Sequence, residues 1–307
     1  ADAYDYPLKD PYLATVIGTP SEFQPKLPEK IDYEMLSLKV FPERVIPDVF
    51  WHQREFRYSL TYQKGEAPLI FVIAGTGASF YSSNMIFFQR IFYQAGYHVI
   101  CLSSPTQMNF ILTASNTGLP GNIIRDSEDL YRVMTMAWEQ VKDRIKVSEF
   151  YLTGYSLGGA EAAFVSKLDE DKRVFNFKKV LVINPPVSLH TSARILDEMI
   201  LAALPGGLKD WRAWLDGLLG RFSELYKTMG HVDLDHDFLY GVYRALPKDQ
   251  PPKQENLATM IGTAFRISSN NMIFTSDVMT NAGLIVPKNL KLKATDSLYD
   301  YFRLTST

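Results

Sequence analysis

Residues 149–160 constrain the fold of this chain more than any other segment, because a strand-forming run leads directly into a serine between glycines. The residues Phe-Tyr-Leu-Thr favour a strand, and residues 157–168 are rich in alanine and leucine, which favour a helix. Between them the chain reads Gly-Tyr-Ser-Leu-Gly, with Ser156 at the centre. A serine on a sharp strand-to-helix turn is held in a strained conformation that lifts its hydroxyl above the sheet. Gly154 and Gly158 are then needed because the two backbones pass too closely there for a Cβ atom.

Predicted strands and helices alternate along the chain from residue 69 to residue 183. The predicted order is a buried strand at 69–73, a helix around 84–95, a strand at 98–102, a helix around 123–143, a strand at 150–153, a helix at 157–168 and a strand at 180–183. Such alternation implies a parallel sheet with right-handed crossovers. Two earlier segments with alternating apolar residues, 35–40 and 56–62, predict antiparallel edge strands. The predicted fold class is therefore α/β, with a mostly parallel sheet flanked by helices.

A second glycine-containing loop follows the strand at 69–73 and reads Ala-Gly-Thr-Gly-Ala-Ser at 74–79. Together with the turn at Ser156, this loop resembles two motifs of the α/β-hydrolase superfamily, in which the loop after the third strand supplies half of an oxyanion hole. Ala74 stands where that family usually has a histidine. The resemblance implies an α/β-hydrolase fold with a helical cap.

The same resemblance assigns roles to individual residues. Ser156 would be the nucleophile, the backbone N–H groups of Thr76 and Leu157 would form the oxyanion hole, and Gly75 and Gly77 would shape the loop. The N-terminus of the following helix would favour the developing negative charge. A plainer interpretation also stands, in which both segments are ordinary glycine-rich turns between strand and helix and the serine has no catalytic role.

Composition changes along the chain predict three regions. Residues 1–48 are rich in proline and are expected to form an extended arm, and residues 49–190 are expected to form the hydrolase core. Residues 191–307 form the predicted cap or lid region, with the core resuming after the chain end. Within it, 191–245 carries helical apolar spacing and no strand signal, and an apolar cap would suit a hydrophobic acyl chain.

The base of a serine hydrolase is the part that the sequence does not supply. In this fold the order along the chain is Ser, then Asp or Glu, then His. The chain has five histidines, none of them after residue 236: His52, His98, His190, His231 and His236. His190 and His236 remain weak candidates for the base. Residues 231–237 mix histidine and aspartate, but the spacing is not typical of zinc sites, so we expect a solvated acidic loop and no metal or other cofactor.

The last residues of the chain also lack the strands that should carry the acid and the histidine. Residues 273–277 and 284–287 are the nearest approaches to strands there. The sequence therefore predicts that the natural protein continues past Thr307, and that residues 1–307 alone are almost inactive.

Charge and composition narrow the partners and the compartment. The net charge is −2 and no basic stretch with interleaved aromatic residues occurs, which argues against nucleic acid as a partner. The chain contains no run of about 18 apolar residues, so the sequence predicts no membrane-spanning helix. The single cysteine, Cys101, excludes an internal disulfide and is expected to be a small buried residue. The chain begins at Ala1 without methionine, which fits either a mature protein whose signal peptide has been removed or a chain shortened at its start; of the two, we expect an exported, periplasmic protein.

The predicted function is hydrolysis of a carboxylic ester, with a lipid as the candidate substrate, through an acyl-enzyme on Ser156. The chain is also similar to exported bacterial α/β hydrolases that are linked or fused to the outer-membrane lipoprotein that removes misplaced phospholipid. That resemblance implies a peripheral membrane or envelope partner. The alternative function is a non-catalytic α/β-hydrolase scaffold that binds a lipid or a protein partner.

Overall fold

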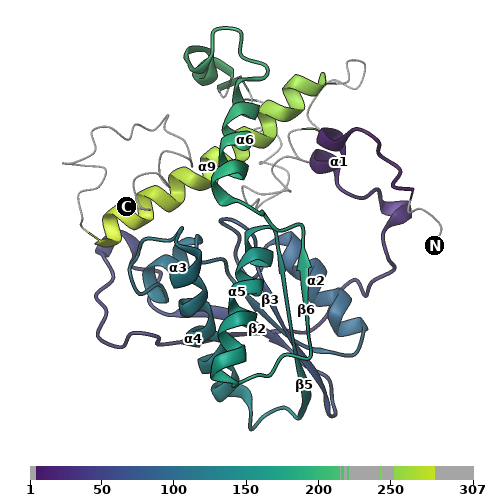
Figure 1. Cartoon of the computed structure of the whole chain (residues 1–307), viewed down its shortest axis with the longest axis vertical. Helices are drawn as coiled ribbons and strands as arrows, with labels where there is room; N and C mark the ends of the chain where they lie inside the picture. Colours follow the sequence, from purple (N-terminus) through teal and green to yellow (C-terminus); the bar gives the residue numbers. More distant parts are fainter. Residues whose placement is uncertain (1–4, 215, 218–219, 221–242, 244–251, 281–307) are drawn as a thin grey trace. The chain divides into compact units, whose positions relative to one another are not determined.

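The computed structural model describes residues 5–214, 216–217, 220, 243 and 252–280 (Figure 1). They fall into two compact units. The sheet unit contains residues 27–189 and 269–280, and the helical unit contains residues 5–26 with the described residues between 190 and 268. The divisions predicted after residues 48 and 190 remain predictions.

The sheet unit is built on a six-stranded sheet in the order β1-β2-β4-β3-β5-β6. The strands are β1 (Glu34–Leu38), β2 (Phe56–Thr61), β3 (Ala67–Ile73), β4 (His98–Leu102), β5 (Val147–Tyr155) and β6 (Lys179–Ile183). The strands from β3 to β6 are mutually parallel, whereas β2 runs antiparallel to both β1 and β4. The predicted antiparallel pair is confirmed, but β2 is not an edge strand, because β4 pairs with its other side.

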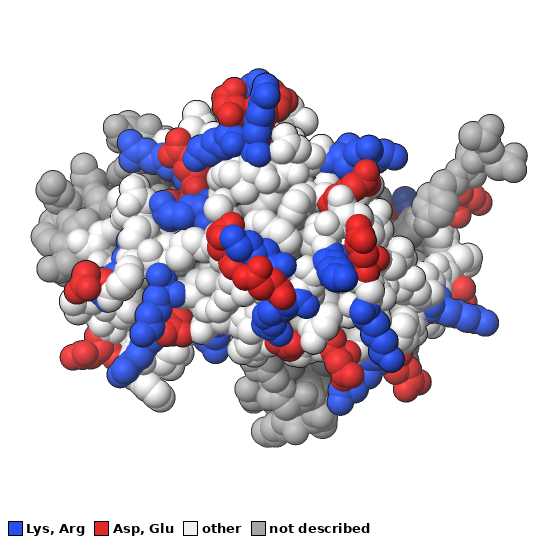
Figure 2. Space-filling view, turned by 90° about the horizontal axis from the view of Figure 1, so that it is seen from below, with Lys and Arg blue, Asp and Glu red and all other residues white. Residues whose placement is uncertain are grey.

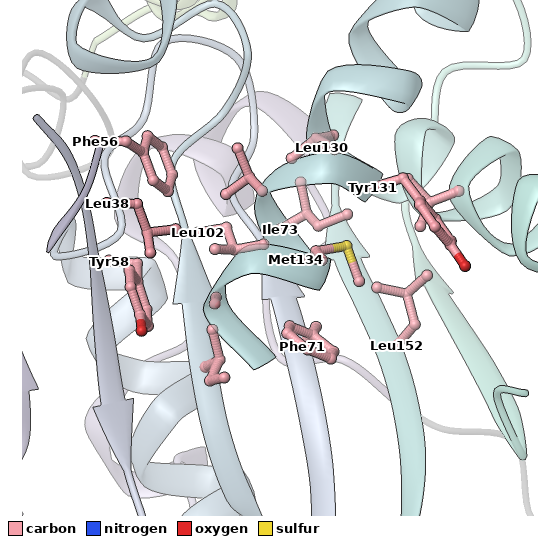
Figure 3. Close-up of a cluster of buried hydrophobic side chains, with 14 of the residues drawn as sticks. Leu38, Phe56, Tyr58, Phe71, Ile73, Leu102, Leu130, Tyr131, Met134 and Leu152 are labelled. Carbon is pink, nitrogen blue, oxygen red and sulfur yellow. The ribbon is translucent and has the colours of Figure 1, made fainter. Parts of the chain in front are cut away.

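Helices cover both faces of this sheet. They are α2 (Ser83–Gln94), α3 (Met108–Thr113), α4 (Ile123–Val141) and α5 (Leu157–Lys172). The larger core lies between the sheet and α4 and α5, where Leu130 and Met134 of α4 lie against Phe71 and Ile73 of β3 (Figure 3). The opposite face packs against α2 through a second core that includes Cys101. Successive side chains of β3 point to opposite faces of the sheet. Because helices cover both faces, the side chains on both sides of β3 are buried, and this explains why its sequence is a continuous run of apolar residues.

The helical unit contains α1 (Pro11–Ile17), α6 (Leu189–Leu201) from His190 onwards, and the first part of α9 (Gln254–Thr280). Its main core joins Val16 of α1 to four apolar residues of α9: Leu257, Met260, Ile261 and Ala264. Gly262 of α9 permits the close approach of α6, because a Cβ atom there would lie 2.6 Å from the carbonyl oxygen of Leu196. The described residues of this unit after residue 190 are thus largely helical, as the sequence predicts, and their apolar side chains pack on one another.

Three elements differ from the predictions. α1 is a helix within the segment predicted to be extended, with Pro11 in its first turn and Asp10 as its N-cap, where proline is tolerated. α3 is a short helix that the sequence patterns do not predict. Residues 273–277, considered as a weak strand, lie inside α9, because packing overrides their β-branched composition. Short 3-10 turns occur at Ser21–Phe23 and Asp48–Phe50.

The described sheet unit has the α/β architecture predicted from the sequence, with a mixed, mostly parallel sheet, helices on both faces and a serine turn after β5. Residues 284–287 and the expected further strands lie outside the described residues. Figure 2 shows one face of the molecule, on which acidic and basic side chains are interspersed. None of the described helices combines the length and the apolar character needed to cross a membrane.

Candidate active site

Ser156 lies at the turn between β5 and α5, at the edge of the sheet where the parallel strands end. Its φ of 55° and ψ of −123° are strained for a residue with a side chain. The backbone holds it there from both sides, because its N–H donates to the carbonyl of Ile183 at 2.9 Å and its carbonyl accepts from Gly159 N–H at 2.9 Å. This is the conformation expected of the serine in a G-x-S-x-G turn.

The glycines around Ser156 are required by contacts between backbones. A Cβ atom on Gly154 would lie 2.0 Å from the carbonyl oxygen of Gly158, and one on Gly158 would lie 2.4 Å from the carbonyl oxygen of Ile73. Both distances are too short for any side chain, and backbone atoms cannot move aside cheaply. The sequence interpretation of these two glycines therefore agrees with the geometry.

The loop after β3 contacts the serine directly. A Cβ atom on Gly75 would lie 3.3 Å from the Cβ atom of Ser156 and 3.2 Å from the carbonyl oxygen of Tyr155. Gly77 has a φ of 71°, in the left-handed region that favours glycine. The two loops that the sequence singled out are thus in contact at one edge of the sheet.

The backbone N–H groups near Ser156 divide into those that already have an acceptor and those that have none among the described residues. Gly77 N–H donates to the Oγ1 atom of Thr106 at 2.7 Å, and Ala78 N–H donates to the carbonyl of Gly75 at 3.0 Å. The N–H groups of Thr76 and Leu157 have no acceptor among the described residues. These are the two donors that the sequence assigned to the oxyanion hole, and that role remains a prediction.

The Oγ atom of Ser156 makes no hydrogen bond among the described residues, so no base is assigned to it there. His98 is fully buried at the start of β4, where its Nδ1 atom accepts from Gln63 N–H at 3.0 Å and its Nε2 atom donates to the carbonyl of Lys146 at 2.9 Å. It is therefore structural.

Of the other histidines, His52 is exposed and its ring contacts the ring of Trp51. His190 is exposed at the start of α6, in the helical unit. His231 and His236 lie outside the described residues. The candidacy of His190 and His236 remains untested.

Two buried carboxyl groups, one on the serine helix α5 and one on α4, are not marked by any sequence pattern. Glu161 is fully buried on α5 and neither of its carboxyl oxygens has a hydrogen-bond partner among the described residues. Burial, and then the nearby Asp126, raise its pKa well above the ordinary value. Asp126 on α4 accepts from Gly121 N–H at 2.7 Å, and burial raises its pKa to about 7. Their positions on helix faces give no signal that distinguishes them from surface acids.

No group of three or more His, Cys, Asp or Glu side chains is arranged to bind a metal within the described part of the chain. Cys101 is buried, as expected, and burial raises the pKa of its thiol to about 12. A thiol with so high a pKa stays protonated at neutral pH, so Cys101 acts as an apolar core residue.

No family model matches the chain, and no curated protein matches it. Among solved structures it is similar to Est1E from Butyrivibrio proteoclasticus, with 15% identity and a TM-score of 0.35 over 47% of this chain and 53% of that protein. It is also similar to a fungal esterase from Rhizomucor miehei, with 14% identity and a TM-score of 0.37 over 61% of this chain and 52% of that protein.

A third similar structure is a brefeldin A esterase, described as a bacterial homologue of human hormone-sensitive lipase, with 14% identity and a TM-score of 0.37. That alignment covers 72% of this chain and 54% of the esterase. The chain thus spans about half the length of these three proteins.

Proposed function

We propose that this chain is a serine hydrolase that cleaves a carboxylic ester through an acyl-enzyme on Ser156. The observation that carries the proposal is the contact between the strained Ser156 and the loop at Gly75, with 3.3 Å from the position of a Cβ on Gly75 to the Cβ of Ser156. The N–H groups of Thr76 and Leu157, which have no acceptor among the described residues, follow Gly75 and Ser156 directly in the chain. Backbone donors fixed beside a nucleophile are the arrangement that stabilises a tetrahedral oxyanion.

The reaction would proceed in two steps. The Oγ atom of Ser156 attacks the acyl carbonyl carbon while a histidine takes the hydroxyl proton, and the negative charge that develops on the carbonyl oxygen is bound by the two backbone N–H groups. The bond to the alcohol then breaks as the histidine returns the proton to it. Water attacks the acyl-enzyme in the same way and releases the acid. His190 and His236 are the candidates for this histidine.

The substrate class proposed is a lipid-like ester, and the compartment proposed is the periplasm. An apolar cap would cover a long acyl chain, and an envelope or peripheral membrane partner would place the enzyme near its substrate. These proposals rest on the composition after residue 190 and on the resemblance to exported hydrolases. The alternative, a scaffold that binds a lipid or a protein partner without turnover, is favoured by one observation, since the Oγ atom of Ser156 makes no hydrogen bond among the described residues.

The test is covalent labelling of the whole gene product with a fluorophosphonate probe. Labelling and p-nitrophenyl butyrate turnover should both be lost in Ser156→Ala. They should be kept in Ser166→Ala, which changes a partly exposed serine on the same helix. Unchanged turnover in Ser156→Ala would exclude the mechanism. Absence of labelling in a wild-type protein that binds a fluorescent fatty acid would favour the scaffold.

A further inference from the structure

The loop after β3 is held by a second loop that the sequence interpretation does not assign to the site. That second loop, residues 103–107, follows β4, which is parallel to β3 and adjacent to it. Parallel neighbours end at the same edge of a sheet, so the two loops emerge side by side. Ser103, Ser104 and Thr106 are buried, with exposed fractions of 1%, 0% and 3%.

Thr106 makes the central contact. Its Oγ1 atom accepts from Gly77 N–H at 2.7 Å and lies 2.8 Å from the Oγ atom of Ser104. The Oγ atom of Ser104 in turn accepts from Thr106 N–H at 3.3 Å. The two hydroxyls thus share one proton in a hydrogen bond while each also accepts a backbone N–H group. A threonine hydroxyl can do this because it has one donor and two acceptor sites.

Further hydrogen bonds join the same two loops. Ser104 N–H donates to the carbonyl of Ala78 at 3.1 Å, and Phe80 N–H donates to the Oγ atom of Ser103 at 3.0 Å. The loop after β3 is therefore hydrogen-bonded to the buried loop at three residues, Gly77, Ala78 and Phe80. Thr76 lies between Gly75, which contacts Ser156, and Gly77, which is bound to Thr106.

We propose that Thr106, supported by Ser104, is the positioning residue of the oxyanion loop. By binding Gly77 N–H it removes that group from the site, and it fixes the peptide plane next to the one that carries Thr76 N–H. A donor held in place before the reaction needs no reorganisation when charge develops, which is the source of its catalytic effect. The catalytic part of this inference rests on the proposed function.

The test compares Thr106→Val and Thr106→Ser in the whole gene product. Valine has nearly the shape of threonine but no acceptor, whereas serine retains the hydroxyl. The matched control is Thr113→Val, which changes another buried threonine, one whose hydroxyl donates within α3 to the carbonyl of Asn109. Circular dichroism spectra and urea midpoints establish that each variant is folded.

Two measurements separate the bond from its effect on catalysis. Amide hydrogen exchange of residues 74–80 should be about 5- to 10-fold faster in Thr106→Val than in wild type, and unchanged in Thr113→Val. For p-nitrophenyl butyrate, kcat should fall about 10- to 100-fold with KM almost unchanged, somewhat less than the loss of a whole oxyanion donor. Thr106→Ser should restore most of both.

The outcomes are distinct. Unchanged exchange in Thr106→Val overturns the proposal at its structural basis. Faster exchange with unchanged kcat overturns the positioning role, as does an equal loss of kcat in Thr113→Val. A wild-type protein that neither hydrolyses the ester nor reacts with the fluorophosphonate overturns the proposed function and the catalytic role with it, while the exchange measurement still reports on the hydrogen bond.

Discussion

Asp126 should make the stability of the sheet unit depend on pH, and Asp126→Asn should remove much of that dependence. Burial raises the pKa of Asp126 from 3.8 to about 7; the hydrogen bond from Gly121 N–H opposes this rise, and the charge of Asp129 adds a smaller increase. A raised carboxyl pKa means that the folded protein keeps a proton that the unfolded chain releases. Stability is therefore greatest in acid, and it falls as the pH rises from about 4 towards 7.

The size of the effect follows from the two pKa values. Their difference is 7 − 3.8 = 3.2, and each unit corresponds to about 1.36 kcal/mol, so charging Asp126 in the folded state costs about 4 kcal/mol at pH 8. Asparagine never ionises, and its side-chain oxygen can still accept from Gly121 N–H. Asp126→Asn should therefore be about 4 kcal/mol more stable than wild type at pH 8 and within about 1 kcal/mol of it at pH 4.5.

The assay is urea unfolding followed by circular dichroism at pH 4.5, 6 and 8. The matched control is Glu128→Gln, which removes an exposed carboxyl from the same helix and should change stability little at any of the three pH values. Glu161→Gln should act in the same direction as Asp126→Asn, because Glu161 is buried beside that carboxyl and its pKa is also raised. A stability difference that is the same at pH 4.5 and pH 8 would falsify this reasoning.

The other predictions concern backbone contacts and one buried carboxylate. Gly158→Ala should destabilise the protein by about 3 kcal/mol or more, because the new Cβ atom would lie 2.4 Å from the carbonyl oxygen of Ile73; calorimetry measures the loss. Gly75→Ala should fold, since its nearest contact is 3.2 Å, but it should lower ester turnover by shifting the loop. Asp169→Ala should cost about 2–4 kcal/mol in urea unfolding, because this buried carboxylate accepts from three backbone N–H groups and a tyrosine hydroxyl, whereas the exposed Asp171→Ala should cost little.

Much of the sheet can be predicted from local patterns. The strand expected at 98–102 has the same bounds as β4, and α4 and α5 begin where the sequence places them. These elements are long or fully buried, so their composition alone identifies them. The turn at Ser156 is predictable for a different reason, since only glycine tolerates the close approaches that Gly154 and Gly158 make.

Other elements depend on contacts between residues far apart in the chain. α1 is short, and its only fully buried apolar residue, Val16, packs against α9 more than 200 positions later. Residues 273–277 have a strand-like composition, but they continue a 27-residue helix whose buried positions fix its conformation. Propensity over five residues is too weak to decide against such packing.

Some parts of the candidate site can likewise be predicted from the sequence, whereas others depend on contacts between distant residues. The loops at 74–79 and at Ser156 can be found because glycine marks them, whereas Ser-Ser-Pro-Thr at 103–106 looks like any polar turn. Its importance arises from strand order, since β3 lies between β4 and β5 and the three loops that follow these strands therefore meet at one edge. The loop after β5 carries Ser156, and the loop after β4 carries Thr106, whose hydroxyl accepts from Gly77 N–H in the loop proposed to supply the oxyanion donor. In a chain with this strand order, the search for positioning residues should therefore begin in the loop after β4, even where that loop has the composition of an ordinary turn.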